Sequence, residues 1–357
     1  MSSLAVRAVR RLVLATAAIA VVVPVTLSSP ASAATQAPPG IFGTSDPTYD
    51  GVFRQSVALI GLRAAQTPIP PTALAWLVGQ QCASGAFEAF RADPTTPCST
   101  PDPVAFSGPD SNSTALAAMA LQGLGQTAPA ARAVAALISA QNADGGWGYT
   151  LGSPSDVNST GLSLAALKSQ PAKVGARAAI KRATSYLAKA AYPCSAKPAQ
   201  RFGLPYQPGQ TVNALATAQA LIGIAGTLPF DHIAATSVAG ATCRRPLVER
   251  VSSYLDRLIR ATNGRIPSAL DRKQVDWNTT AAAVVGLTGA GAAPEAIRTA
   301  IDSLGAHTVD YVKTGTDVSP AAVGTLIQAA VGAGVNPRAF GDARTNVVAL
   351  LLRTLQR

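Results

Sequence analysis

Acidic and aromatic residues are scarce in this chain. Only 18 of its 357 residues are Asp or Glu, only three of those are Glu, and aromatic residues make up 5%. With so few large side chains, the core must consist of many thin elements that pack closely. With so few carboxylates, no pair of acids stands out as the acid and base of a hydrolase.

Histidine and cysteine are also rare. The chain has two histidines, His232 and His307, and four cysteines, none of them in a Cys-x-x-Cys pair. A zinc site built from cysteine and histidine needs a denser set of ligands. We therefore expect no metal and no cofactor.

Alanine is the residue that the chain has in excess. There are 72 alanines, about a fifth of the length, and 48% of all residues are hydrophobic. Such apolar content argues against disorder, and alanine has the highest helix propensity. The composition therefore predicts a helical globular protein.

Residues 1–34 have the pattern of a secretory signal peptide. Three arginines (Arg7, Arg10, Arg11) precede an apolar stretch over 12–27, and a small-residue site at 31–33 follows. The alternative is an uncleaved anchor, but the stretch is shorter than the ~20 residues of a spanning helix. We expect a secreted, extracellular protein without stable membrane insertion after removal of the signal.

The remaining charge is basic and scattered. Loss of the three arginines lowers the formal net charge from +11 to +8. Such a charge favours anionic cell-surface polymers, but no run of basic residues forms a binding motif. We expect a monomer whose partner is a small molecule or a cell-surface polymer, and no nucleic acid.

Four cysteines in an exported chain favour disulfide bonds. Cys82 and Cys98 flank one loop, and Cys194 and Cys243 bracket the longest irregular region. This placement favours the pairs 82–98 and 194–243. Spacing alone leaves the pairing of 98 with 194 and of 82 with 243 open.

Six pairs of helical segments repeat along the chain. The first segment of each pair starts with polar residues and continues as a small, apolar helix. These segments start at Asp50, Asp110, Asp156, Thr211, Asp276 and Asp317. The second segments are amphipathic, with apolar residues three and four apart, and cover 70–81, 128–141, 175–190, 246–262, 293–306 and 340–357.

This difference between the segments predicts two layers. Helices that are apolar on most sides belong inside, and helices with one polar face belong outside. We expect an all-α fold, an (α/α)6 toroid of six inner and six outer helices over residues 47–357. Residues 35–46 are expected to be a flexible mature N-terminus.

One loop carries a recognisable motif. Gln141, Gly145 and Trp147 match Gln-x-x-x-Gly-x-Trp, and Gln81, Gly85 and Phe87 form a degenerate copy one repeat earlier. The segment resembles the QW repeat of squalene and oxidosqualene cyclases, and the helix pairs resemble the prenyltransferase and squalene-cyclase repeat superfamily. The resemblance implies a terpenoid cyclase-like α/α toroid, in which this motif is structural.

The catalytic signatures of that superfamily are missing. The chain has no Asp-x-Asp-Asp motif, no Cys-Gly-Glu-Gln thioester sequence, and Asn in place of the thiolate of Asp-x-Cys. The resemblance therefore supports the fold and leaves the activity undecided.

The starts of the inner helices provide the candidate site. In a toroid they lie at one mouth of the ring, and aspartate there caps the helix and also lines any pocket. The candidate ligand-binding residues are Asp110, Asn112, Asp156, Asn158, Asn213, Asp276, Trp277, Asn278 and Asp317, with Asp50 a weaker member and the asparagines one step deeper than the aspartates.

Two functions follow from this site. The first is a non-catalytic protein that binds an apolar or amphipathic small molecule, a glycan or a peptide at the polar mouth of a central cavity. The second is a divergent enzyme, terpene cyclase-like, prenyltransferase-like or active on polysaccharides, that uses the aspartates. A surface interaction module is a third possibility that depends on charge alone.

Overall fold

The computed structural model describes residues 37–170, 172–226, 235–237 and 242–357. The chain divides into two units, Met1–Ala34 and Thr35–Arg357. The predicted signal peptide lies outside the described residues, and so does His232. All described residues belong to the second unit.

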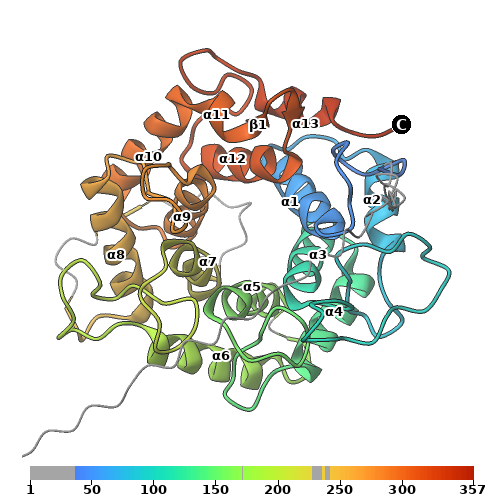
Figure 1. Cartoon of the computed structure of the whole chain (residues 1–357), viewed down its shortest axis with the longest axis horizontal. Helices are drawn as coiled ribbons and strands as arrows, with labels where there is room; N and C mark the ends of the chain where they lie inside the picture. Colours follow the sequence, from blue (N-terminus) through green and yellow to red (C-terminus); the bar gives the residue numbers. More distant parts are fainter. Residues whose placement is uncertain (1–36, 171, 227–234, 238–241) are drawn as a thin grey trace, which may run out of the picture. The chain divides into compact units, whose positions relative to one another are not determined.

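Within the described residues, six helices form an inner ring (Figure 1). They are α1 (Gly51–Ala64), α3 (Ser111–Gly123), α5 (Val157–Lys168), α7 (Ala214–Ala225), α9 (Trp277–Gly289) and α12 (Pro320–Gly332). Each packs against the next, and α12 packs against α1, so the ring is closed. The helix α3 is buried on all sides over residues 111–121, as expected for an inner element.

Six further helices lie outside the ring among the described residues. They are α2 (Pro71–Gly79), α4 (Thr127–Ser139), α6 (Ala176–Ala190), α8 (Leu247–Ala261), α10 (Pro294–Ala306) and α13 (Val347–Arg353). On α4 the buried residues are Ala130, Ala133, Val134 and Leu137, which is the spacing of one helix face. The structure thus has the all-α toroid architecture that the two classes of segment predict.

Two details differ from the expected layout. The last outer helix was expected over 340–357, but only 347–353 is helical, because Phe340 pairs with Thr345 and the chain after Thr354 pairs with the N-terminal segment. In addition, the short helix α11 (Thr308–Val312) and the antiparallel pair β1 (Lys313–Thr314) and β2 (Asp317–Val318) precede α12.

Small residues allow the inner helices to approach closely. A methyl group on Gly161 of α5 would lie 2.6 Å from the Cα of Ala220 on α7, and one on Gly61 of α1 would lie 2.7 Å from the carbonyl oxygen of Gly324 on α12. Only glycine fits at such crossings. The alanine and glycine excess of the composition is therefore a packing requirement of the ring.

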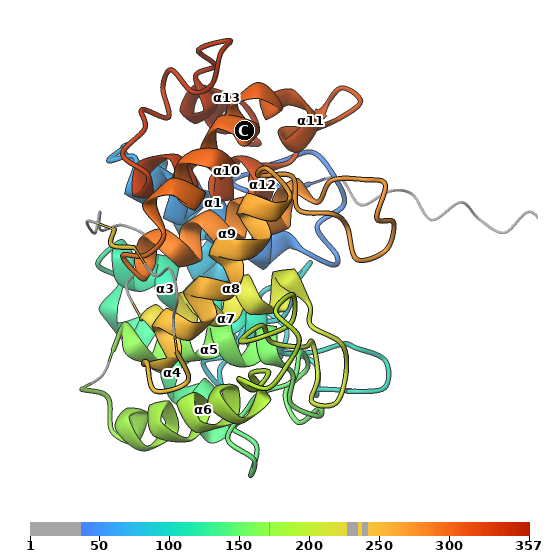
Figure 2. The same cartoon turned by 90° about the vertical axis from the view of Figure 1, so that its left-hand side faces the viewer.

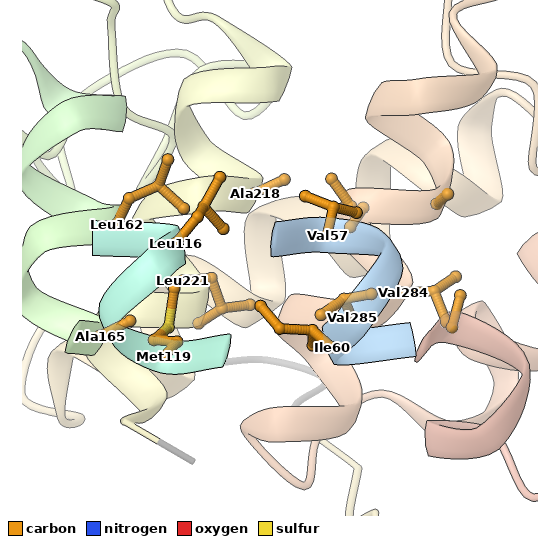
Figure 3. Close-up of a cluster of buried hydrophobic side chains, with 14 of the residues drawn as sticks. Val57, Ile60, Leu116, Met119, Leu162, Ala165, Ala218, Leu221, Val284 and Val285 are labelled. Carbon is orange, nitrogen blue, oxygen red and sulfur yellow. The ribbon is translucent and has the colours of Figure 1, made fainter. Parts of the chain in front are cut away.

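Apolar side chains from the inner helices converge in one buried cluster (Figure 3). Leu116 and Met119 of α3, Leu162 of α5 and Val57 and Ile60 of α1 are each at most 7% exposed. Burial of a side chain of this size stabilises the fold by about 1.5–3 kcal/mol. The cluster begins within two turns of the starts of α1, α3 and α5, and we call it the apolar floor.

The first described residues pair with the C-terminal residues. Ile41 and Phe42 are fully buried, and the backbone around them pairs with the end of the chain: Gly40 N donates to Gln356 O (3.0 Å) and Gln356 N donates to Ile41 O (2.9 Å). The described part of this segment is therefore packed and paired with the C-terminal residues.

Both favoured disulfide bonds are present. Cys82 is bonded to Cys98 and Cys194 to Cys243, each with 5.7 Å between the Cα atoms. This confirms the predicted pairing and excludes the crossed alternative. No helix of the described part of the chain has the length and apolarity needed to cross a membrane.

Candidate functional site

The long loops that lead into the inner helices project from the same side of the toroid (Figure 2). Their residue ranges are 80–110, 141–156, 191–213 and 262–276. We call this side the mouth. The first residues of α3, α5, α7 and α9 follow these loops directly, so their N-cap residues belong to this side.

Four inner helices share one capping geometry. In each, the side chain of the N-cap residue accepts a hydrogen bond from the backbone N–H three residues later, at 2.7 to 2.8 Å. The four N-cap residues are Asp110, Asp156, Asn213 and Asp276. Each such cap stabilises its helix by about 1 kcal/mol.

Two of these aspartates use both carboxylate oxygens. The second oxygen of Asp156 accepts from the Ser159 hydroxyl at 2.8 Å, and that of Asp276 accepts from the Thr279 hydroxyl at 2.6 Å. The hydroxyls of Ser159 and Thr279 are therefore bonded to the caps. These carboxylates are engaged within their own helices.

Three expected members of the site have other roles than predicted. Asn213 is itself the N-cap of α7 and not one step deeper, because the fourth repeat starts two residues after Thr211. Asp317 is exposed in β2, where it pairs with Thr314, and Ser319 caps α12. Asp50 makes no capping bond, since its carboxylate accepts from Arg54 Nη1 at 3.0 Å.

A threonine four residues after each cap bonds the preceding loop. Its hydroxyl oxygen accepts from a backbone N–H of the loop at 2.9 to 3.4 Å and donates to the carbonyl of the cap residue. The four are Thr114, Thr160, Thr217 and Thr280. We did not identify them from the sequence, although the pattern Asp/Asn-x-x-x-Thr is visible there.

The Gln-x-x-x-Gly-x-Trp segment joins neighbouring repeats. Gln141 Nε2 donates to Gly145 O (2.8 Å) within the loop and to Ala179 O (2.9 Å) on the next outer helix, α6. Trp147 is 1% exposed, and its ring N–H donates to Leu137 O at 2.8 Å. The tryptophan is therefore a packing residue and no platform for a ligand.

The degenerate copy has the same geometry. Gln81 Nε2 donates to Gly85 O and to Pro129 O on α4, each at 2.9 Å, and Phe87 is fully buried. Both loops thus bond an outer helix of the following repeat. This arrangement explains why Gln, Gly and an aromatic residue occur together at that spacing.

The caps Asp110 and Asp156 are covered by loops from the next repeat. Tyr149 O accepts from Ser111 N at 2.8 Å, and Tyr206 O accepts from Val157 N at 2.9 Å. Burial under these loops raises the pKa of Asp110 to about 7 and that of Asp156 to about 6, against the capping hydrogen bonds, which lower both. The second oxygen of Asp110 has no hydrogen-bond partner among the described residues.

Asparagine amides lie two residues after three of the caps. Asn112 is one helical turn before Leu116 on α3, and Asn158 is one turn before Leu162 on α5, so each shares a face with the residues of the apolar floor. Asn112 is only 9% exposed. The side-chain oxygens of both are buried without a donor in the described structure.

The third asparagine belongs to a different group. Asn278 is exposed, and its side-chain oxygen accepts from the Tyr311 hydroxyl at 3.4 Å. The adjacent Trp277 stacks on His307 with ring centroids 4.8 Å apart, and His307 Nδ1 lies 2.9 Å from Asp310 Oδ2. Trp277 is thus occupied on at least one side by the segment that carries α11.

Among the described residues, one group of possible metal ligands comes together, Cys82, Glu88 and Cys98. Its two cysteines form a disulfide bond. A disulfide offers no thiolate, so this group does not have the donor set of a zinc site.

Comparisons with known proteins identify the fold. No protein-family model matches the chain, and no curated protein matches its sequence. A solved structure of a protein from Actinoplanes is similar at 15% identity, with a TM-score of 0.53 over 84% of this chain and 95% of that one.

Two enzymes are similar to the same extent. They are ent-copalyl diphosphate synthase from Streptomyces platensis (17% identity, TM-score 0.52, 80% of this chain and 50% of that chain) and a sugar epimerase from a ruminal bacterium (12%, 0.52, 83% and 93%). The chain has the terpenoid cyclase-like α/α-toroid fold. This toroid spans half the length of the copalyl diphosphate synthase that it matches.

Proposed function

We propose that this toroid is an exported protein that binds a hydroxyl-bearing small molecule, such as a short glycan, at the mouth of the ring and does not convert it. The observation that carries the proposal is the pair of buried, unpartnered amide oxygens on neighbouring helices, Asn112 on α3 and Asn158 on α5. Two disulfide bonds support export, because such bonds persist in oxidising compartments.

The chemistry of these oxygens selects the ligand. A buried acceptor without a donor costs about 1–3 kcal/mol, and a ligand with O–H groups recovers that free energy by donating to it. One helical turn after each amide comes a leucine, Leu116 or Leu162, whose apolar side chain suits the C–H face of a sugar ring. One protein with the same fold is named a sugar epimerase, which indicates a hydroxyl-rich ligand there.

Binding without catalysis agrees with the state of the carboxylates. Asp156 and Asp276 each use both oxygens within their helix starts. A catalytic pair needs carboxylates that face a substrate across a gap. The aspartates then act by holding the helix starts, and with them the asparagines, in place.

The test is native mass spectrometry of the exported protein with a panel of neutral disaccharides. Replacing Asn112 and Asn158 together by Ala should abolish the complex that the wild-type protein forms. The matched control is Asn336→Ala, because Asn336 caps a turn at the opposite side, where its side-chain oxygen accepts from Arg338 N. Equal binding by the double variant, or no bound sugar in the wild-type protein, would overturn the proposal.

One observation favours the alternative of an enzyme. Asp110, with a pKa raised to about 7 and one unbonded oxygen, has the properties of a general acid at neutral pH. On this alternative the protein turns over acidic polysaccharides, squalene or prenyl diphosphates, and Asp110→Asn removes the turnover. Turnover that persists in Asp110→Asn would exclude this role of the carboxyl group.

A further inference from the structure

A cavity on the outer wall of the toroid has a volume of about 940 Å³. It is bordered by the outer helices α8 and α10 and by residues of the 191–213 loop next to the Cys194–Cys243 disulfide. Three arginines line it, Arg201, Arg257 and Arg260. None of the predicted site residues except the two cysteines belongs to it.

The two acidic residues that line this cavity bind the same arginine. Arg260 Nε donates to Asp256 Oδ1 and Arg260 Nη1 donates to Glu295 Oε2, each at 2.8 Å. Both acids that line the cavity are therefore bonded to the same guanidinium. In the described part of the chain, neither Arg201 nor Arg257 forms a salt bridge.

The guanidinium of Arg257 is held against the backbone of Arg201. Arg257 Nη2 donates to the backbone oxygen of Arg201 at 2.7 Å, and its Nη1 donates to Ser253 Oγ at 3.2 Å. Burial lowers the pKa of Arg257, and the charge of Arg201 lowers it further. Arg201 Nε is buried and has no acceptor among the described residues.

We infer that this cavity binds an oxyanion, a phosphate or carboxylate group, between Arg201 and Arg257. A guanidinium donates two parallel hydrogen bonds to such a group, and an anion placed between two like charges removes their repulsion. The volume exceeds that of a single ion, so the group belongs to a larger molecule such as a segment of an anionic polymer. The inference does not depend on the sugar site at the mouth.

The test is isothermal titration with three probes at constant ionic strength: inorganic phosphate, a phosphate-linked oligomer, and an oligogalacturonate that carries carboxylates. Wild-type protein should bind at least one probe, and Arg201→Gln with Arg257→Gln should weaken that binding at least tenfold. The matched control is Arg177→Gln on α6, an exposed arginine of the same charge. It should change the affinity less than twofold.

The same experiment distinguishes loss of the site from a folding defect, and a phosphate ligand from a carboxylate ligand. Arg201→Gln alone tests the site if the double variant unfolds, because the side-chain hydrogen bond from Arg201 Nη2 to Ala196 O is long, at 3.4 Å, and its loss costs little stability. The probe with the higher affinity identifies the anion as phosphate or carboxylate. Equal weakening by the Arg177 control, or no binding of any probe to the wild-type protein, would overturn the inference.

Discussion

At the scale of the residue, similar aspartates are in different environments. Asp110 and Asp156 lie under loops from the next repeat and are at most 2% exposed, whereas the Asp50 side chain is 47% exposed. Burial disfavours the charged carboxylate, so the pKa rises most where the covering loop excludes water. Aspartates at the same helix position thus differ in how far burial raises their pKa.

This difference predicts a pH dependence of stability for Asp110→Asn. The Asp110 carboxyl titrates near 3.8 when unfolded and near 7 when folded. Between these values the folded protein retains a proton that the unfolded chain has lost, so Asp110 reduces stability progressively as the pH rises from about 4 to about 7. Asparagine also caps a helix but does not titrate. The stability of the variant relative to wild type should therefore increase over this range, as measured by thermal denaturation.

A control with the opposite sign is available in Asp93→Asn. Hydrogen bonds from Thr95 hold the pKa of Asp93 below its ordinary value. Asp93 therefore adds stability as the pH rises through the acid range, and its loss should lower the relative stability of the variant there. A pH-independent difference between Asp110→Asn and wild type would contradict the buried, protonated state of this carboxyl.

The capping aspartates of the site could be predicted from residue types alone. Asp110, Asp156 and Asp276 were expected at helix starts because aspartate is a preferred N-cap, and the structure places them there. The starts of α7 and α12 were each expected two residues too early, at Thr211 and Asp317, since the bridge of Pro205 with Val212 and the β1–β2 pair lengthen the loops before these helices. Such pairings depend on contacts between distant segments.

At the scale of the element, the crossing of α5 and α7 limits the inner ring. Gly161→Ala should destabilise the protein by about 1–3 kcal/mol, because the new methyl group would lie 2.6 Å from backbone atoms of α7. Urea denaturation measures the change. The helices would have to separate to accept it.

The matched control is Gly79→Ala on the outer helix α2. A methyl group there meets no atom within 4 Å, and alanine is the better helix former by about 1 kcal/mol. This variant should be as stable as wild type or more stable. Equal destabilisation by both substitutions would contradict a packing role for Gly161.

Inner and outer helices were distinguishable from their apolar patterns, and the element order followed the repeat. The last outer segment shows where such patterns fail. Its apolar residues continue beyond Arg353, but Leu355 pairs with Phe42 in an extended bridge. Helical periodicity in a sequence does not reveal that an extended segment far away in the chain, here around Phe42, pairs with these residues.

At the scale of the whole molecule, the two ends of the described unit complete the ring. Removing residues 355–357 deletes two backbone hydrogen bonds, between Gln356 and the segment Gly40–Ile41. We expect a loss of about 2 kcal/mol, since each bond contributes about 0.5–1.5 kcal/mol. Denaturation in urea measures it.

Removal of Arg357 alone is the control for this truncation. Arg357 is exposed and carries none of the bonds that join the two segments. This shorter truncation should leave stability unchanged. If both truncations behaved alike, the pairing of the two ends would not contribute to the stability of the ring.

The sequence by itself determined the helical repeat, the inner and outer layers, and the aspartate caps of α3, α5 and α9. These depend on local propensity and on periodic burial, which neighbouring residues set. Only the tertiary structure decided that Asn112 and Asn158 lack donors, that burial raises the pKa of Asp110 to about 7, and that Arg201 and Arg257 share a cavity. The reason is physical: a hydrogen-bond partner, a covering loop or a neighbouring charge comes from residues far away in the chain, and its presence depends on how the ring closes.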